Sequence, residues 1–262
     1  MRTIVLIQAR MGSTRLPGKV LKKIRGKTLV GILLERLKKS KSIDKIIVAT
    51  STDVSNDGLV ELVHSLGVEA YRGSENDVLD RFYNALQSHE CDYVVRITAD
   101  CPLIDPSLLD KVIDFAINEN VDYVSNVGFG KEHFPDGQDI EVFKIWALEN
   151  AWNNAKLPSE REHVTPYIRS NKTNLFTNAN YDAEIDLGFI RMTVDEKEDF
   201  DAIEVLVNEL GINCSWLDYA NFILKYPEKF KNQDIIRNEG YLKSLLDDKN
   251  FSEKNEKRTG VI

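Results

Sequence analysis

The sequence of 262 residues has few cysteines and histidines, and neither residue type has the spacing of metal ligands. Its three cysteines, Cys91, Cys101 and Cys214, also lack the even count of a disulfide framework. Such cysteines fit a reducing compartment, so we expect a cytoplasmic location. The four histidines give no reason to predict a zinc site.

Long apolar runs and an excess of basic charge are missing as well. The apolar run at the N-terminus stops at Gln8, which is too short for a signal-peptide core or a membrane span. With 34 basic and 42 acidic residues, the net charge is −8 and the isoelectric point is near 5.2. This balance argues against nucleic acid or an anionic membrane as a partner. The hydrophobic fraction of 42% is nevertheless ordinary for a protein with a full core.

Apolar runs rich in Val and Ile alternate with helical patterns in the first half of the chain. The runs predict strands at Thr3–Ala9, Lys45–Ser51, Val68–Arg72, Tyr93–Thr98 and Val121–Ser125. The patterns between them predict helices at Leu29–Leu37, Leu59–Leu66, Val78–His89 and Ser107–Glu119. This alternation implies right-handed crossovers, and therefore an α/β fold with a mostly parallel sheet flanked by helices.

After residue 125 the alternation breaks, and residues 127–188 are predicted to form an insertion on the substrate side. The insertion holds a loop at Gly128–Gln138, a strand at Ile140–Ile145 and helices at Trp146–Ala155 and Glu160–Ser170. A strand at Ile190–Val194 and a helix at Glu198–Leu210 follow. We expect residues 1–246 to form a single domain and the polar residues 247–262 to fray as a tail.

The loop after the first predicted strand, in IQARMGSTRLPGKVL, concentrates Arg10, Arg15 and Lys19 with two glycines. Fixed positive charge and a backbone that can approach closely suit a polyphosphate. The spacing excludes a P-loop, because five residues separate Gly12 from Gly18 and Val20 follows the lysine. Two glycines six apart are no dinucleotide fingerprint either. Since ligands of open α/β sheets bind at the carboxyl ends of the strands, the loop favours nucleotide chemistry over a solvated basic turn.

Asp100 and Asp195 each follow a predicted strand directly. Asp100 can cap the turn before Pro102, and this role and a magnesium-binding role are equally open. A carboxylate beside a cationic phosphate loop is how Mg²⁺ is held between protein and substrate phosphates. Asp195 has the same placement, which strengthens the prediction of a metal site.

Two further stretches carry polar groups whose roles stay open. In the first, Ser74 or Asp77 can cap a helix, while Ser74 and Asn76 can also contact a nucleobase. Arg81 reaches either a phosphate or Asp77, four residues earlier. The second stretch lies in the insertion, where charged groups either face water or grip a second, polar substrate. These candidates for substrate binding are Gln138, Asp139, Glu141, Arg161 and His163.

Six motifs together resemble the cytidylyltransferase family that includes the spore coat polysaccharide biosynthesis protein SpsF. They are IQARMGSTRLPGKVL, YRGSENDVLDRF, VRITADCPLID, PDGQDIEVF, EREHVTPYI and RMTVDEKEDFDAI, and they span roughly residues 1–210. That family is related to the 3-deoxy-manno-octulosonate cytidylyltransferases. Two positions depart from the family pattern: Ala99 stands where many relatives have glycine, and Glu196-Lys197 replaces Thr-Pro.

The resemblance implies a Rossmann-like nucleotide-diphospho-sugar transferase fold, CTP as co-substrate, Mg²⁺ as cofactor and a possible homodimer. It implies catalytic roles for Arg10, Lys19 and Asp100, and metal ligation by Asp100 and Asp195. The nucleotide site would comprise Ala9, Arg10, Gly12, Ser13, Arg15, Lys19, Ser74, Asn76, Asp77, Arg81, Thr98 and Asp100.

The predicted reaction is in-line attack by an acceptor oxygen on the α-phosphorus of CTP, with the cationic loop stabilising the departing pyrophosphate. The acceptor would be a sugar, a sugar acid or a related acidic metabolite, for surface polysaccharide or glycoconjugate synthesis. Three alternatives stay open: a glycosyltransferase that uses a nucleotide sugar, a nucleotidyltransferase with another base, and a nucleotide sensor without turnover. Replacing Lys19 with Ala should lower catalysis more than stability if the lysine supports little of the core.

Overall fold

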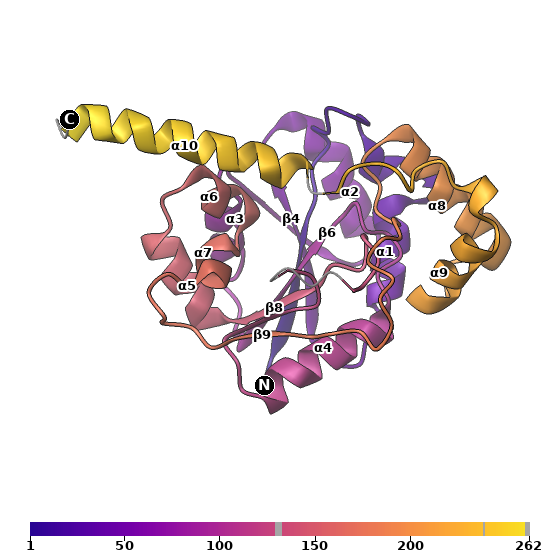
Figure 1. The fold of residues 1–262 in the computed structure, drawn as a ribbon, viewed down its shortest axis with the longest axis horizontal. Helices are drawn as coiled ribbons and strands as arrows, with labels where there is room; N and C mark the ends of the chain where they lie inside the picture. The colour runs from indigo at the N-terminus through magenta and orange to yellow at the C-terminus, as the bar shows by residue number, and fades with distance from the viewer. Residues whose placement is uncertain (129–132, 238, 260–262) are drawn as a thin grey trace.

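The computed structural model describes residues 1–128, 133–237 and 239–259 (Figure 1). A seven-stranded sheet of order β5-β4-β1-β6-β8-β7-β9 forms its centre. The strands of this sheet are β1 (Thr3–Gln8), β4 (Lys45–Ser51), β5 (Glu69–Gly73), β6 (Tyr93–Thr98), β7 (Tyr123–Ser125), β8 (Glu141–Lys144) and β9 (Asn178–Asn180). A small antiparallel pair is formed by β2 (Lys23–Ile24) and β3 (Lys27–Thr28).

Helices surround the sheet on both faces (Figure 1). The α-helices are α1 (Leu29–Leu37), α2 (Asp57–Ser65), α3 (Val78–Ala85), α4 (Pro106–Asn118), α5 (Ile145–Asn154), α6 (Pro158–His163), α7 (Pro166–Ser170), α8 (Lys197–Leu210), α9 (Trp216–Lys225) and α10 (Glu239–Thr259). Short 3₁₀ turns are η1 (Lys19–Leu21), η2 (Val54–Asn56) and η3 (Pro227–Lys229). No helix in the described part of the chain is long and apolar enough to cross a membrane.

The sheet is mixed but mostly parallel, as the alternating pattern predicts. Strand β1 pairs in parallel with β4 and β6, and β4 pairs in parallel with β5. Strand β8 is the exception, because it runs antiparallel to β6 and β7. The predicted α/β architecture with flanking helices is therefore confirmed.

Alternating side chains of β1 build the core on both faces of the sheet. Val5 and Ile7 pack in the apolar cluster that contains α1, α2 and α4, whereas Ile4 and Leu6 pack in the cluster with α3 and α5. This period of two is what a strand buried on both sides requires. A third cluster, under α8 and α9, buries Met192 and Val194.

The topology brings several chain segments to one edge of the sheet. The parallel strands β1 and β6 both end there, at Gln8 and Thr98. Because β8 is antiparallel to β6, it begins where β6 ends, and its first residue Glu141 pairs with Arg96. The loops after β1 and β6 therefore meet the segment that leads into β8.

Three sequence predictions are wrong. Ile190–Val194 is extended but has a single bridge, from Arg191 to Asp136, since its apolar side chains pack on α8 and α9 rather than in the sheet. The helix predicted at Glu160–Ser170 is two helices, because Val164 has a φ of 70° and Pro166 starts α7. The segment predicted to fray from residue 247 continues α10 as far as Thr259.

Candidate active site

The loop after β1 is fixed at both ends and leaves its first cation exposed. The Met11 N–H donates to Asn56 Oδ1 at 2.9 Å, and the Gly18 N–H donates to the Met11 carbonyl at 3.2 Å. Gly18 has a φ of 66°, which glycine adopts without a steric penalty. Arg10 is exposed and has no hydrogen bond or ion pair with any described residue. Asn56, whose buried amide anchors this loop, could not be singled out from the sequence.

Lys19 connects the two predicted metal ligands. Its Nζ donates to Asp100 Oδ2 at 3.1 Å, to Asp195 Oδ1 at 2.9 Å and to the Val194 carbonyl at 2.7 Å. Burial favours the neutral amine, but the charges of Asp100 and Asp195 outweigh it and raise the pKa of Lys19. Burial likewise opposes ionisation of Asp100, yet Lys19 and hydrogen bonds from its neighbours hold the pKa of that carboxyl low. Both groups are therefore charged at neutral pH.

Two adjoining cavities open at this edge of the sheet. The first, of about 820 Å³, lies between the loop after β1 and α10. The second, of about 560 Å³, lies between the segment leading into β8, helix α7 and the start of α10. Residues that line both are Arg15, Arg96, Thr98, Asp100, His163, Asp195, Glu239 and Gly240. The cavities therefore form one cleft with two halves, which meet at Asp100 and Asp195.

Most residues predicted to bind the nucleotide line the first cavity. They are Ala9, Arg10, Gly12, Ser13, Arg15, Lys19, Thr98 and Asp100. The remaining four, from Ser74 to Arg81, are outside the described lining of both cavities but lie beside the same loop. A methyl group on Gly12 would be 3.6 Å from Glu75 Oε1. The positive charge of Arg10 is also close enough to lower the pKa of Arg81.

The loop from Ser74 to Asp77 has the predicted capping role. Asp77 accepts a hydrogen bond from the Asp80 N–H at 2.9 Å and so caps α3, while Ser74 Oγ accepts from the Asp77 N–H at 3.1 Å. Arg81 donates to the Ser74 carbonyl at 2.7 Å and is fully buried. Burial, and then the charge of Arg10, lower the pKa of Arg81 to about 10. Asn76 is exposed.

Two of the residues predicted to bind the substrate make hydrogen bonds inside the protein. Gln138 is fully buried, where it donates to the Leu103 carbonyl and accepts from the Asp105 N–H, both at 2.9 Å. Arg161 makes three hydrogen bonds of 2.6–3.0 Å to the carboxylate of Asp77. Within the described lining of the two cavities, neither Gln138 nor Arg161 appears. Arg161 therefore fixes the loop that caps α3.

Glu141 and His163 do reach the cleft. Glu141 accepts hydrogen bonds from Arg96 at 2.5 Å, from Tyr123 at 2.7 Å and from Thr165 at 2.5 Å. Burial would raise the pKa of Glu141, but Arg96 and Arg169 outweigh it and lower the pKa. Burial lowers the pKa of His163 to about 4. Its buried Nε2 has no hydrogen-bond partner among the described residues, so the imidazole is neutral and this nitrogen is unsatisfied.

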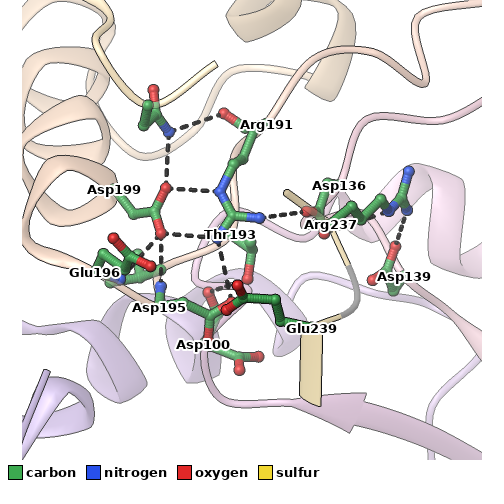
Figure 2. Close-up of polar contacts among 12 residues, drawn as sticks. Asp100, Asp136, Asp139, Arg191, Thr193, Asp195, Glu196, Asp199, Arg237 and Glu239 are labelled. Atoms are coloured by element: carbon green, nitrogen blue, oxygen red, sulfur yellow. Dashed lines mark hydrogen bonds and ion pairs between the residues drawn. The ribbon is translucent and has the colours of Figure 1, made fainter. Parts of the chain in front are cut away.

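Arg191 holds the segments around the second cavity together through buried ion pairs (Figure 2). Its guanidinium binds Asp199 at 2.8 and 2.9 Å, Asp136 at 2.8 Å and Asp195 at 3.2 Å. Burial disfavours the cation, but Asp199 and the other carboxylates outweigh it and raise the pKa of Arg191. Neither Arg191 nor Asp199 is among the residues predicted from the sequence. An arginine inside the apolar run Ile190–Val194 was the available signal, since a buried arginine needs partners.

Gly137 allows two chain segments beside the second cavity to pack closely against each other. With a φ of 105°, it brings the chain so near Met192 that a β-carbon would lie 2.6 Å from the Met192 carbonyl carbon. On the other side of Gly137, Asp139 accepts a hydrogen bond from Arg237 at 3.0 Å (Figure 2). Segments that are far apart in the sequence thus meet around the second cavity.

The carboxylates of Asp100 and Asp195 suit a magnesium ion. Both point to the position of the Lys19 ammonium, between the two halves of the cleft. In the described residues, no group of three or more metal-binding side chains comes together. Mg²⁺ usually takes one or two carboxylates and completes its shell with water and substrate phosphates. The donor set fits an ion bound together with a polyphosphate.

A basic loop after the central strand, facing two carboxylates at the carboxyl edge of the sheet, defines a nucleotide-binding α/β protein. Residues 4–239 match the cytidylyltransferase family, and the chain belongs to this family of nucleotidyltransferase enzymes. The resemblance stated from the motifs is therefore confirmed.

Relatives and a solved structure agree with this assignment. The chain is 34% identical over 218 residues to the spore coat polysaccharide biosynthesis protein SpsF of Bacillus subtilis, covering 79% of this chain and 87% of the relative. It is 27% identical over 249 residues to the 3-deoxy-manno-octulosonate cytidylyltransferase of Thermodesulfovibrio yellowstonii, covering 87% and 95%. The structure of a cytidylyltransferase from Leptospira borgpetersenii matches with a TM-score of 0.84 and 36% identity, covering 90% of this chain and 100% of that one.

Proposed function

We propose that the protein transfers CMP from CTP to a small sugar-like or acidic acceptor and releases pyrophosphate. The observation that carries this proposal is the two-part cleft, whose halves share Arg15, Asp100 and Asp195. A group-transfer enzyme needs such an arrangement, because donor and acceptor must meet at one set of charged groups. The names of the relatives, which concern spore coat polysaccharide and 3-deoxy-manno-octulosonate, point to surface polysaccharide or glycoconjugate synthesis.

The first cavity supplies the groups that a nucleoside triphosphate needs. Arg10 is exposed at its wall, and Lys19 keeps its charge beside Asp100. Arg15 contacts Asp195 at 3.1 Å and Glu239 at 3.3 Å, and a phosphate group can compete for it. Together these cations would hold the triphosphate and stabilise the charge that develops on the leaving pyrophosphate.

Asp100 and Asp195 would hold Mg²⁺ together with the phosphates. The ion, when bound, would withdraw electrons from the phosphate oxygens and so ease attack at phosphorus. Lys19 would keep Asp100 ionised and would hold the carboxylates of Asp100 and Asp195 aimed at the same point. Ala99, where many relatives have glycine, lies at the wall of the first cavity and is 2% exposed, so its methyl group would lie beneath the nucleotide.

The second cavity supports a polar acceptor. Arg169 lines it and lies over the Tyr241 ring at 5.2 Å, without an ion pair to any described carboxylate. Such a guanidinium suits the carboxylate or phosphate of an acidic acceptor. The neutral His163 and the hydroxyl group of Tyr241 lie in the same lining and suit the hydroxyl groups of a sugar.

Pyrophosphate release tests the proposal. Purified protein is incubated with Mg²⁺, each of the four nucleoside triphosphates and a panel of sugars, sugar acids and small acids, with Asp100→Asn as the inactive control. We expect release that needs both CTP and an acceptor. Release with another triphosphate would make the protein a nucleotidyltransferase for that base, and release of a nucleoside diphosphate from a nucleotide sugar would identify a glycosyltransferase.

A further inference from the structure

We propose that Asp139 takes the proton from the acceptor hydroxyl group as the acceptor oxygen attacks CTP. The inference rests on the proposed function and adds the residue that activates the acceptor. It comes from the geometry of the second cavity, where one carboxylate oxygen of Asp139 has no partner among the residues that the structure describes.

Asp139 is held at one oxygen and open at the other. Its Oδ1 accepts a hydrogen bond from Arg237 Nη2 at 3.0 Å, whereas Oδ2 has no hydrogen bond or ion pair with any described residue. The side chain is 33% exposed and belongs to the lining of the second cavity. Arg237 thus orients the carboxylate, and the second oxygen stays available to a bound acceptor.

The other carboxylates of the second cavity are already committed. Glu141 accepts from Arg96, Tyr123 and Thr165, which leaves it charged and poorly basic. Asp100 is bound to Lys19, and Asp195 to Lys19, Arg15 and Arg191.

Asp136 and Glu239 are also paired. Asp136 is 10% exposed and pairs with Arg191 and, at 3.7 Å, with Arg237. Glu239 is the first residue of α10 and pairs with Arg15 through Oε2. Glu239 Oε1 is also without a partner among the described residues, but Glu239 is 55% exposed to solvent, whereas Asp139 is 33% exposed and is oriented by Arg237.

The surroundings of Asp139 also favour its protonation near neutral pH. Burial, together with the negative charges of Asp136, Asp100 and Glu141, outweighs the opposing charge of Arg237 and raises the pKa of Asp139 to about 7. A general base works best when its pKa is close to the pH of the reaction, because it is then both ionised and basic. Asp139 meets this condition, whereas Asp100 and Glu141 do not.

The proposed step balances. The acceptor oxygen forms a bond to the α-phosphorus of CTP, and the proton of that hydroxyl group moves to Asp139 Oδ2. The bond between the α-phosphorus and the bridging oxygen breaks, and pyrophosphate leaves with the electron pair. Asp139 then returns the proton to solvent through the open cavity. No covalent enzyme intermediate forms.

The test is the pH dependence of turnover in Asp139→Asn, with CTP and the acceptor found in the panel. Wild-type turnover should rise with pH through an apparent pKa near 7. Asp139→Asn should lower turnover about 100-fold or more and remove this rising limb of the pH profile. The variant should still show the CTP-dependent rise in melting temperature. Asp234→Asn is the matched control, because Asp234 is exposed, three residues before Arg237, and should keep the wild-type profile.

Variants of Arg237 test whether the cation beside Asp139 sets the pKa of this carboxylate, while Asp139 itself is kept. Arg237→Gln removes the cation that lowers the pKa of Asp139, so the limb should move to higher pH, while Arg237→Lys should leave it in place. Turnover of Asp139→Asn within threefold of wild type, with the limb retained, would overturn the inference and leave the proposed function intact. If wild type releases no pyrophosphate with any acceptor, the proposed function fails and the inference falls with it.

Discussion

The half of the cleft around the first cavity, proposed to bind CTP and called the nucleotide half, and the half around the second cavity, proposed to bind the acceptor and called the acceptor half, are held in place by different means. In the nucleotide half, the groups that face the cavity follow directly on the parallel strands β1 and β6, so the sheet itself positions them. In the acceptor half, residues 136–141, 163–169 and 191–195 and the start of α10 come from distant parts of the chain. Here Arg191 and Arg237, through ion pairs, hold the segments together.

This difference has consequences for how each half responds to change. Strands of a buried sheet resist single substitutions at their ends, because backbone hydrogen bonds and apolar packing hold them. A buried ion-pair network depends instead on every partner, since removal of one leaves uncompensated charge in a region of low dielectric. The acceptor half should therefore be the more fragile of the two, and also the half in which substrate preference can change without loss of CTP binding.

The largest effect is expected for Arg191→Leu. The substitution leaves Asp136, Asp195 and the fully buried Asp199 without their shared cation. The free energy of unfolding should fall by about 3–5 kcal/mol, the usual result of breaking a buried ion pair. Urea denaturation at pH 7 measures it, with Arg2→Leu as the control, since that exposed pair should change stability by less than about 0.5 kcal/mol.

The deficit of Arg191→Leu should also shrink as the pH falls. Arg191 helps hold the pKa of Asp199 low, so this carboxylate stabilises the wild-type fold above its unfolded pKa of about 4, and the contribution is lost as the pH falls through the folded value. Without the arginine that contribution is already missing. If the free energy of unfolding of Arg191→Leu at pH 7 is within 1 kcal/mol of the wild-type value, the acceptor half does not depend on the ion pairs of Arg191.

The second largest effect is expected for Lys19→Ala, on the nucleotide side. Turnover should fall about 100- to 1000-fold, the range found when one group that stabilises a transition-state charge is removed. Because Lys19 is buried against two carboxylates, stability should fall too, by about 1–3 kcal/mol. The assumption that this lysine supports little of the fold does not agree with its three partners.

Pyrophosphate release and thermal unfolding measure the two effects. Lys23→Ala is the matched control, since Lys23 is an exposed lysine four residues later and should keep both values. Wild-type turnover in Lys19→Ala would remove this residue from the mechanism.

The same difference between the halves decides what the sequence can predict. The shared location of Arg10, Lys19 and Asp100 could be predicted because these residues follow apolar runs, and parallel strands all end at one edge of a sheet. Asp195 was also expected near them, although through a strand that does not exist. The segment Ile190–Val194 reaches the site because Val194 donates its N–H to the Asp100 carbonyl at 2.8 Å.

The acceptor half was harder to predict because its partners are far apart in the sequence. Asp136 and Arg191 are 55 residues apart, and Asp139 and Arg237 are 98 apart. No local pattern records such a pairing. Gln138 and Arg161 were chosen for their chemistry alone, and this chemistry serves internal hydrogen bonds. The part of α10 from residue 247 onward is predicted to fray because few apolar residues mark it, whereas polar contacts such as Ser159 to Asp248 hold the first half of the helix.

A smaller effect is expected for Arg161→Lys. This variant tests whether Arg161 supports the nucleotide half or the acceptor half of the cleft. A lysine cannot reproduce the forked contact with Asp77, so the loop that caps α3 should loosen. We expect the KM for CTP to rise about threefold to tenfold, equivalent to about 0.7–1.4 kcal/mol, with the KM for the acceptor unchanged. Arg169→Lys is the matched comparison, because Arg169 lines the second cavity and should raise the KM for the acceptor instead. The opposite pattern would place Arg161 on the acceptor.

The smallest effect is expected for Ser159→Ala, which tests whether α10 belongs to the nucleotide half. Ser159 Oγ donates to Asp248 Oδ2 at 2.6 Å, and the Ser159 N–H, which the variant keeps, donates to Oδ1 at 2.9 Å. Loss of one hydrogen bond to a charged group should weaken the docking of α10 by about 1 kcal/mol. Because Leu242, Ser244 and Leu246 of this helix line the first cavity, CTP should then bind a few times more weakly.

Hydrogen exchange separates this local effect from global unfolding. In Ser159→Ala, amides in the first half of α10 should exchange faster while those of β1 and β6 keep their rates, since a helix that docks at one end can open without the core. Ser252→Ala, at an exposed position of the same helix, is the control. Faster exchange of α10 without any change in CTP affinity would mean that the helix covers the first cavity without contributing to nucleotide binding, and the nucleotide half would then be a property of the sheet edge alone.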